Sequence, residues 1–312
     1  MLRRSLLFLS EREGLKNALL RTRGARSLAE RFVAGERLDG ALEVARSLNR
    51  SGFRVTLDYL GESVAREEEA ERATTAYVES LEHVDGSDVA ATISLKLTQL
   101  GLDIDVDLCA SNLERIVRTA DDLGSFVRID MEGSRHTELT LDAFRRVSAI
   151  SDAVGVVIQS YLLRSEADVT ELVDRRAAVR LCKGAYKEPP TVAYQRKQDV
   201  DANYVHLARR LLDGASGGKV VGGVPPVAIA THDDEMIEQA RAYADAHAVP
   251  VDAFEFQMLY GVRRDVQTEL AGAGYNVRVY VPYGTEWYAY FMRRMAERPA
   301  NLLFVARAAA GD

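Results

Sequence analysis

The sequence predicts an α/β fold: a single distorted (β/α)8 barrel of the TIM type preceded by N-terminal helices. Eight short apolar or alternating runs recur along the chain. The segments between them are longer and show the three-to-four-residue apolar spacing of amphipathic helices. Strands that alternate with helices are typical of βαβ units and a parallel sheet, and eight such units in about 260 residues match one closed barrel.

The elements follow one another in a regular order. The first 50 residues are predicted to be helical, because apolar residues such as Leu15, Leu19 and Phe32 recur at helical spacing. The predicted strands are Phe53–Tyr59, Ala91–Leu97, Phe126–Met131, Val154–Ser160, Ala178–Lys183, Val227–Thr231, Ala253–Leu259 and Val277–Val281. Helices are expected over 62–83, 105–122, 137–150, 165–176, 233–246 and 263–272. We therefore divide the chain into a helical segment, 1–50, and a barrel, 51–312.

An open, doubly wound sheet is the competing architecture. Such a sheet commonly binds nucleotides through a glycine-rich turn after its first strand. No GxGxxG follows a predicted strand here, and the phosphate-loop pattern GxxxxGK[ST] does not occur. These absences favour the barrel. The glycine-rich loop 213–226 is expected at the barrel face opposite the functional site.

The composition excludes some function classes. With 40 basic and 47 acidic residues the net charge is -7, which argues against a nucleic-acid binder. The two cysteines, Cys109 and Cys182, lack zinc spacing and fit the reducing cytoplasm, so no metal site is predicted. No apolar run reaches the roughly 18 residues of a membrane span. The basic, apolar start of the chain leaves open a peripheral contact with a membrane.

Polar residues interrupt the predicted strands or follow them. A barrel places its functional site at the C-terminal ends of its strands, so we expect these residues to converge on one face. They are Asp58, Glu62, Lys96, Asp130, Gln159, Arg180, Lys183, Thr231, His232, Glu255, Gln257 and Tyr280.

Lys96 and Asp130 are expected to form an ion pair on neighbouring strands, because a buried lysine or carboxylate is costly unless it is paired. The pair could be structural, or the ammonium could face a substrate anion. A lysine in a barrel can also form a Schiff base, which makes an aldolase the main rival. Arg180 could stabilise negative charge that develops during a reaction.

Two further strand ends are informative. Lys183, Gly184 and Ala185 place a cation beside bare backbone, which suits a phosphate or the edge of a flavin. His232 is expected to hydrogen-bond a cofactor or the backbone. A metal-ligand role is disfavoured, because the five histidines show neither HxH nor HxxxH spacing.

A helix is expected from about Glu286, directly after the last strand. It carries the neighbouring Arg293 and Arg294, which could hold one carboxylate between them. Such a helix could also be an exposed basic surface. Its position lets it lean over the barrel mouth, which favours the first interpretation.

Taken together, these stretches resemble the proline dehydrogenase family. The matching stretches are SLKLTQLG, RIDME, IQSYL, VRLCKGAY, ATHD, FEFQMLYG and VYVPYG…WYAYFMRR, in family order over residues 53–307. The short length resembles the bacterial monofunctional enzymes. The resemblance implies non-covalent FAD at the barrel mouth, oxidation of L-proline to Δ1-pyrroline-5-carboxylate, and a quinone as electron acceptor.

The resemblance also implies residue roles. It assigns the proline carboxylate to Arg293, Arg294 and Lys96, with Asp130 paired to Lys96. The residues that pack against the proline ring are Tyr280, Tyr290 and Leu259, and the catalytic residues are Asp130 and Arg180. Arg180 contacts the flavin N5 region, and the rest of the FAD is lined by Met131, Gln159, Lys183, Gly184, Ala185, Thr231 and His232.

The resemblance makes Glu62 a gate that reaches Arg293 across the closed mouth. Lys187 stands where the bifunctional branch often has Trp, so the loop there is expected to differ. The rival functions are a Schiff-base aldolase that uses Lys96 or Lys183, and a non-catalytic protein that binds a small carboxylate.

Overall fold

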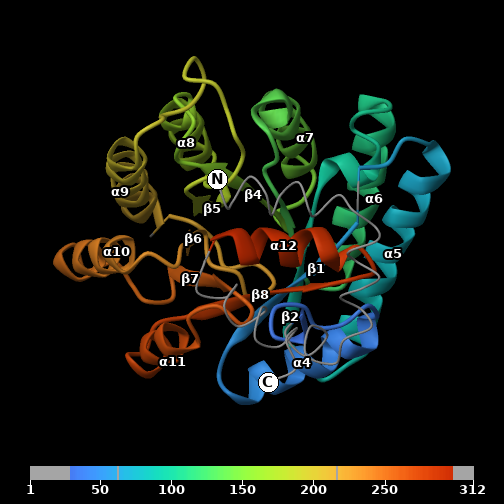
Figure 1. Cartoon of the computed structure of the whole chain (residues 1–312), viewed down its shortest axis with the longest axis horizontal. Coiled ribbons are helices and arrows are strands. Elements are labelled where there is room, and N and C mark those ends of the chain that lie inside the picture. The colour runs from blue at the N-terminus through green and yellow to red at the C-terminus, as the bar shows by residue number, and fades with distance from the viewer. Residues whose placement is uncertain (1–28, 62, 216, 298–312) are drawn as a thin grey trace, which may run out of the picture.

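Eight parallel strands close into one barrel in sequence order, from β1 to β8 (Figure 1). The structure is a computed structural model that describes residues 29–61, 63–215 and 217–297, with the backbone alone for 293–297. The strands are β1 (Arg54–Tyr59), β2 (Ala91–Leu95), β3 (Val127–Ile129), β4 (Val154–Gln159), β5 (Ala178–Cys182), β6 (Val227–Ala230), β7 (Phe254–Leu259) and β8 (Val277–Tyr283). The barrel prediction is confirmed, and the open doubly wound sheet is excluded.

Helices surround the barrel on the outside. They are α4 (Leu38–Arg50), α5 (Glu67–Asp85), α6 (Val106–Asp122), α7 (Thr137–Ser148), α8 (Ser165–Asp174), α9 (Lys197–Ala215), α10 (Asp234–Ala246) and α11 (Arg264–Gly272), with short 3-10 turns at Leu97–Leu100 and Ser134–His136. A last helix, α12 (Trp287–Glu297), follows β8. Each predicted strand and helix of the barrel overlaps an observed one. Most of the predicted helical segment 1–50 lies outside the described residues, and α4 is its last part.

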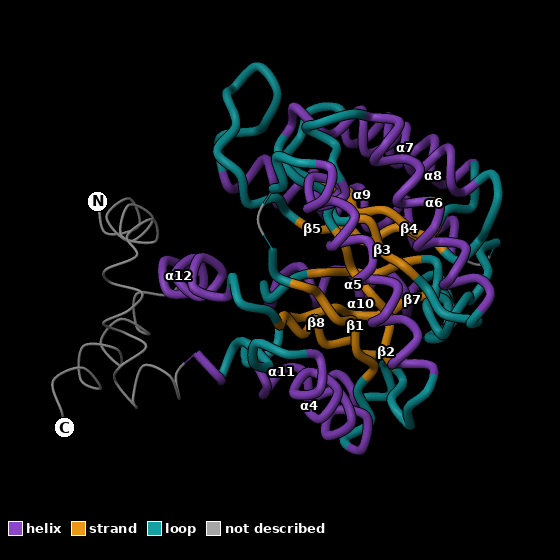
Figure 2. The backbone as a smooth tube through the Cα atoms, turned by 90° about the vertical axis from the view of Figure 1, so that its right-hand side faces the viewer, coloured by secondary structure: helices purple, strands orange, loops and turns teal. Residues whose placement is uncertain are grey.

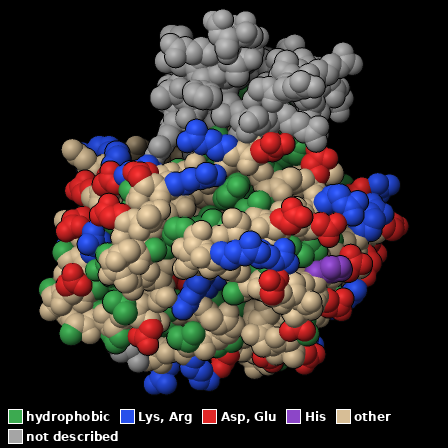
Figure 3. All heavy atoms as spheres, turned by 90° about the horizontal axis from the view of Figure 1, so that it is seen from below, with side chains coloured by type: hydrophobic (Ala, Val, Ile, Leu, Met, Phe, Trp, Pro, Cys, Tyr) green, Lys and Arg blue, Asp and Glu red, His purple; other side chains and the backbone are tan. Residues whose placement is uncertain are grey.

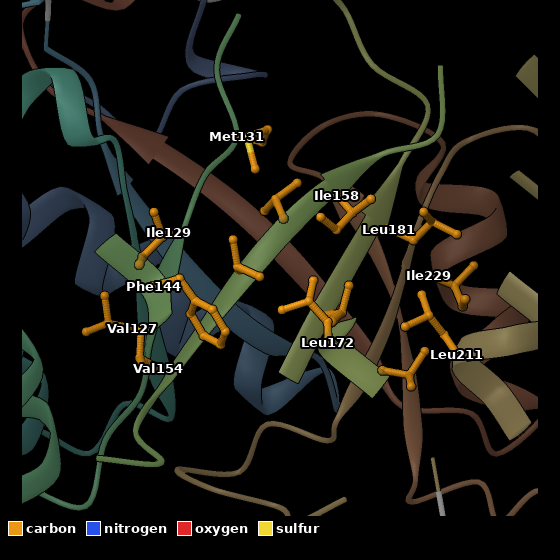
Figure 4. Packing of buried hydrophobic residues seen from close by; sticks show 14 of the residues in the cluster. Val127, Ile129, Met131, Phe144, Val154, Ile158, Leu172, Leu181, Leu211 and Ile229 are labelled. Atoms are coloured by element: carbon orange, nitrogen blue, oxygen red, sulfur yellow. The ribbon is translucent and has the colours of Figure 1, made fainter. Parts of the chain in front are cut away.

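The core between strands and helices is apolar. Side chains alternate between the two faces of a strand, so every second residue points outward to the helices. Figure 4 shows this layer, in which strand residues pack against Phe144 of α7, Leu172 of α8 and Leu211 of α9. The labelled strand residues are Val127, Ile129, Val154, Ile158, Leu181 and Ile229. Burial of such side chains stabilises a fold by about 1.5–3 kcal/mol each.

The inner face of the barrel, in contrast, is polar. Hydrogen bonds join strands that are not neighbours: Tyr280 of β8 reaches Asp130 after β3, and Arg180 of β5 reaches Ser94 of β2. Such contacts can only cross the interior. Interiors of this fold are commonly filled by Val, Ile and Leu. The polar filling here therefore indicates that the interior serves more than packing.

The helix after the last strand distorts the regular pattern. Instead of flanking β8, α12 lies across the C-terminal end of the barrel (Figures 1 and 2). Its residues Trp287 and Phe291 belong to an apolar cluster with Phe32 and Leu60. The chain turns into it at Gly284, where φ is +128° and an added Cβ would lie 2.7 Å from the Leu60 carbonyl oxygen. This packing holds the helix over the mouth.

The foot of the barrel is closed by its own polar cluster. The prediction that Glu255 and Gln257 lie at the mouth with the other polar residues was wrong. Glu255 lies near the start of β7, at the end opposite the mouth, where Nε of Arg278 donates to its Oε1 at 2.7 Å. Gln257 also binds Glu255 and so belongs to this lower layer. The Gly223 carbonyl accepts from Arg54 at 2.6 Å and from Arg278 at 2.9 Å. Gly223 therefore places the described part of the loop 213–226 at the foot, as predicted.

The surface carries charges of both signs. On the face seen in Figure 3, basic and acidic side chains are interspersed rather than gathered by sign. Within the described ranges, no helix has the length and apolarity needed to span a bilayer.

Candidate active site

Four residues, each within or directly after a different strand, meet at the axis of the mouth. Arg180 donates from Nη1 to Oδ1 of Asp130 at 2.8 Å and from Nη2 to Oγ of Ser94 at 3.0 Å. Tyr280 donates from Oη to Oδ2 of Asp130 at 2.7 Å. The guanidinium of Arg180 also lies 5.3 Å from the centre of the Tyr280 ring. Asp130 therefore holds a cation and a phenol in fixed positions.

The partner predicted for Lys96 was wrong. Nζ of Lys96 donates to Oδ1 of Asp58 at 2.8 Å, whereas both oxygens of Asp130 are engaged by Arg180 and Tyr280. The register between β1 and β2 explains why Lys96 pairs with Asp58. Asp58 pairs with residue 94 of β2, two positions before Lys96, and alternate residues share a face.

Charge neighbours keep Lys96 protonated. Burial by itself lowers the pKa of Lys96, but the carboxylates of Asp58 and Asp130 outweigh that effect, so the pKa is raised. For Tyr280, burial and then the negative charges of Asp130 and Asp58 raise the pKa well above its usual value. The site therefore holds a permanent ammonium and a neutral phenol at neutral pH.

Two polar atoms at the mouth are buried without a partner among the described residues: Oε1 of Gln159 and Nε of Arg180. The other end of the Gln159 amide donates to the Met131 carbonyl at 3.1 Å, which fixes its orientation. Both side chains are less than a tenth exposed. Buried polar groups are rarely left unpaired, so these atoms point to a ligand.

The rim between β6 and β7 is tied together by His232. Its Nε2 accepts from the backbone N–H of Leu259 at 2.9 Å, so Nε2 is unprotonated. Of the two roles expected for His232, a hydrogen bond to a cofactor or to the backbone, the structure shows the backbone bond. Thr231 accepts through Oγ1 from the N–H of Asp233 at 3.1 Å. These bonds fix the strand ends predicted to line a cofactor.

Lys183 lies just after β5 and is ion-paired with Asp201 and Asp233. The next residue, Gly184, has a φ of +107°, and an added Cβ would lie 2.2 Å from the ring of Tyr161. Only glycine fits that position. Ala185 follows it in the loop that leads to α9.

Several predicted residues cannot be placed fully. Glu62 lies outside the described residues. The backbone of Arg293 and Arg294 is part of α12, but their side chains lie outside what the structure describes. Tyr290 of the same helix is buried in the cluster that anchors α12, and Leu259 ends β7 at the mouth.

The sequence analysis did not single out three side chains that the structure brings to the mouth: Ser94, Asp201 and Asp233. Ser94 is a small polar residue in an apolar run, whereas Asp58 was expected at the mouth but without its partner. Asp201 lies in a charged stretch of α9 that has the pattern of a solvated helix face, and Asp233 has the pattern of an ordinary helix cap. Only the strand alternation could have singled out Asp58 and Ser94 as inward-facing.

The fold and the site together define an enzyme built on a (β/α)8 barrel, with ion-paired cations and unpaired polar atoms at the mouth. A family model described as "Proline dehydrogenase" matches residues 41–307. The chain belongs to the proline dehydrogenase family.

Individual relatives agree with that assignment. "Proline dehydrogenase 1" of Bacillus subtilis subsp. natto is 41% identical over 308 residues, which cover 98% of each chain. "Proline dehydrogenase" of Deinococcus radiodurans is 41% identical and covers 90% of this chain and 89% of its own. The solved structure of proline utilization A from Bdellovibrio bacteriovorus, inactivated by N-propargylglycine, superposes with a TM-score of 0.80 at 28% identity. That match covers 88% of this chain and 33% of the longer protein.

Proposed function

We propose that this chain binds FAD in the barrel mouth and oxidises L-proline to Δ1-pyrroline-5-carboxylate. The observation that carries the proposal is the set formed by Ser94, Asp130, Arg180 and Tyr280 at the mouth of a family barrel, where Nε of Arg180 and Oε1 of Gln159 are buried without a described partner. When bound, the flavin supplies the electron acceptor for the substrate C–H bond.

The residues at the mouth fit a flavin. Gln159 offers a buried carbonyl oxygen and Arg180 a buried N–H, and neither has a described partner. Gly184, which is half-buried and has no side chain, directly follows Lys183. A flavin has ring edges that donate and accept hydrogen bonds, and a phosphate-bearing tail. The remaining groups proposed to line it are Met131, Ala185, Thr231 and His232.

A charge balance at the mouth explains why α12 is needed. Each described cation there already has a carboxylate: Lys96 has Asp58, and Arg180 has Asp130. Glu132 adds a further negative charge and is held by the N–H and hydroxyl of Thr98. A substrate carboxylate gains little from such a neutral or acidic site. We therefore propose that Arg293 and Arg294 supply the cations that bind it, with Lys96 beside them.

The other residues orient the substrate. Tyr280, Tyr290 and Leu259 offer apolar surface for a five-membered ring. Asp130 acts as a positioning residue, because both of its oxygens are occupied by Arg180 and Tyr280. Arg180, a permanent cation with a free Nε, stabilises negative charge that develops beside it. Glu62 stays a proposed gate over the mouth.

We also propose a quinone as the electron acceptor. Quinones reside in bilayers, so the chain would work in the cytoplasm and at the inner face of the cell membrane, held there by peripheral contact.

The raised pKa of Lys96 weighs against the aldolase. A Schiff base forms on a neutral amine, whereas Asp58 and Asp130 keep this lysine charged. Lys183 is held between two carboxylates. Borohydride should therefore trap no keto acid on the purified chain.

The decisive experiment is anaerobic addition of L-proline to the purified protein. Flavin absorbance should be present and should bleach on addition of L-proline. Protein that carries no flavin after purification, and takes up none, would overturn the proposal. Arg293→Ala and Arg294→Ala should each raise KM for proline, because each removes a charge-assisted contact of about 1.5–3 kcal/mol. An unchanged KM in both variants would remove these arginines from the site.

A further inference from the structure

Two lysines and two aspartates form a closed ring of ion pairs at the rim of the mouth. Lys183 follows β5, Lys197 and Asp201 lie on the first turns of α9, and Asp233 is the N-cap of α10. Nζ of Lys183 contacts Asp201 and lies 2.6 Å from Oδ2 of Asp233. Nζ of Lys197 contacts the same Asp201 and lies 3.3 Å from Oδ2 of Asp233. The ring carries no net charge.

The two lysines of this ring are not equivalent. The side chain of Lys183 is 24% exposed, whereas that of Lys197 is 71% exposed. Burial raises the pKa of Asp201, but hydrogen bonds from Lys183 and Lys197 outweigh it, so the pKa is lowered and the carboxylate stays charged. Lys197 is therefore the outer cation, and Lys183 is the one beside the proposed flavin site.

The two carboxylates fix the direction of the Lys183 ammonium. An ammonium has three N–H donors in a tetrahedral arrangement. Asp201 on α9 and Asp233, the N-cap of α10, accept two of them. These two bonds restrict the direction of the third N–H, which has no partner among the described residues and is left to donate to a ligand. Without the carboxylates, a flexible lysine would lose rotamer freedom on binding a ligand.

We propose that Asp201 and Asp233 are positioning residues that aim the ammonium of Lys183 at an anionic part of the flavin cofactor. Lys197 neutralises their second negative charge from the solvent side. The inference rests on the proposed function, because it takes the cofactor role of Lys183 from there.

The sign of the effect separates this role from simple charge balance. If the carboxylates only neutralised Lys183, removing one would leave more positive charge at the rim and strengthen binding of an anionic flavin nucleotide. If they aim Lys183, removing one should weaken binding in spite of that gain.

The test measures the dissociation constant for FAD by equilibrium dialysis with the FAD-depleted full-length chain. Asp201→Asn should raise the constant about tenfold. Asp199→Asn is the matched control on the same helix, because Asp199 pairs with Arg196 instead and should leave the constant unchanged. Asp233→Asn should raise the dissociation constant in the same way, because it removes the other carboxylate that holds Lys183. Asn is as good an N-cap as Asp, so α10 should keep its cap.

A double-mutant cycle excludes a merely structural effect. In a Lys183→Met background, Asp201→Asn should no longer weaken FAD binding, because the group that it aims is gone. Weakening that persists in that background, or an unchanged or tighter constant in Asp201→Asn alone, overturns the inference. Failure of the wild-type chain to bind FAD would instead overturn the proposed function, so the two failures are distinguishable.

Discussion

Nζ of Lys96 lies 2.8 Å from Oδ1 of Asp58, and this contact splits the charges of the mouth into two separate pairs. Asp130 is left to Arg180 and Tyr280. The lysine that we propose to face the substrate and the arginine that we propose to face the flavin are thus held by different carboxylates. A change in one pair need not disturb the other.

This separation predicts the outcome of two double-mutant cycles. Lys96→Met combined with Asp58→Asn should show a coupling energy of about 1–3 kcal/mol in urea unfolding, because the pair is direct and largely buried. Lys96→Met combined with Asp130→Asn should couple more weakly. Equal coupling in both cycles would mean that Lys96 shares its charge between the two aspartates.

Tyr280→Phe should lower kcat/KM for proline about tenfold, which corresponds to the loss of one buried hydrogen bond. The variant removes the phenol that binds Oδ2 of Asp130 and leaves the aromatic ring in place. Tyr243→Phe is the matched control, because its phenol binds Asp213 on an exposed helix face. Steady-state rates for the two variants decide the matter, and equal rates would remove the Tyr280 hydroxyl from the site.

Much of the barrel could be predicted because each strand carries a local signal. In the sequence, β4 and β5 are short apolar runs, and polar residues such as Arg180 are exceptions within them. The pairing could not be predicted. Lys96 has one strand on each side, and the sequence does not show which carboxylate, Asp58 or Asp130, already has other partners.

The second feature that could not be predicted is the position of a residue along the barrel axis. Glu255 and Leu259 belong to the same strand and face the same interior, yet one lies at the foot and the other at the mouth. That difference depends on where β7 begins, and strand ends are poorly marked in the sequence. The rim ring was missed for another reason: Asp201 is separated from Lys183 by a long loop, and its helix face has an ordinary charged pattern.

The foot cluster should serve stability and not catalysis. Glu255 is fully buried and paired with Arg278 at 2.7 Å, so Glu255→Ala would leave a buried guanidinium without its counter-charge. We expect a loss of about 3–5 kcal/mol in the free energy of unfolding. The dissociation constant for FAD of the folded variant should stay at the wild-type value. Glu269→Ala is the control on an exposed pair, expected within about 0.5 kcal/mol of wild type. A Glu255→Ala variant of unchanged stability but weakened FAD binding would contradict this, because it would show that the foot cluster affects the cofactor site.

The buried phenols should make the fold sensitive to alkali. Burial raises the pKa of Tyr77, Tyr204 and Tyr280 well above the usual 10.0, and raises that of Tyr283 to about 12. Above pH 10 the unfolded chain has lost these protons while the native state keeps them, so the free energy of unfolding falls as the pH rises. Below that pH the contribution is complete. In an alkaline titration, phenolate absorbance should rise in two steps, the exposed tyrosines first and the buried ones together with loss of helical circular dichroism. A single step near pH 10 with the circular dichroism intact would show that these phenols reach solvent in the native barrel.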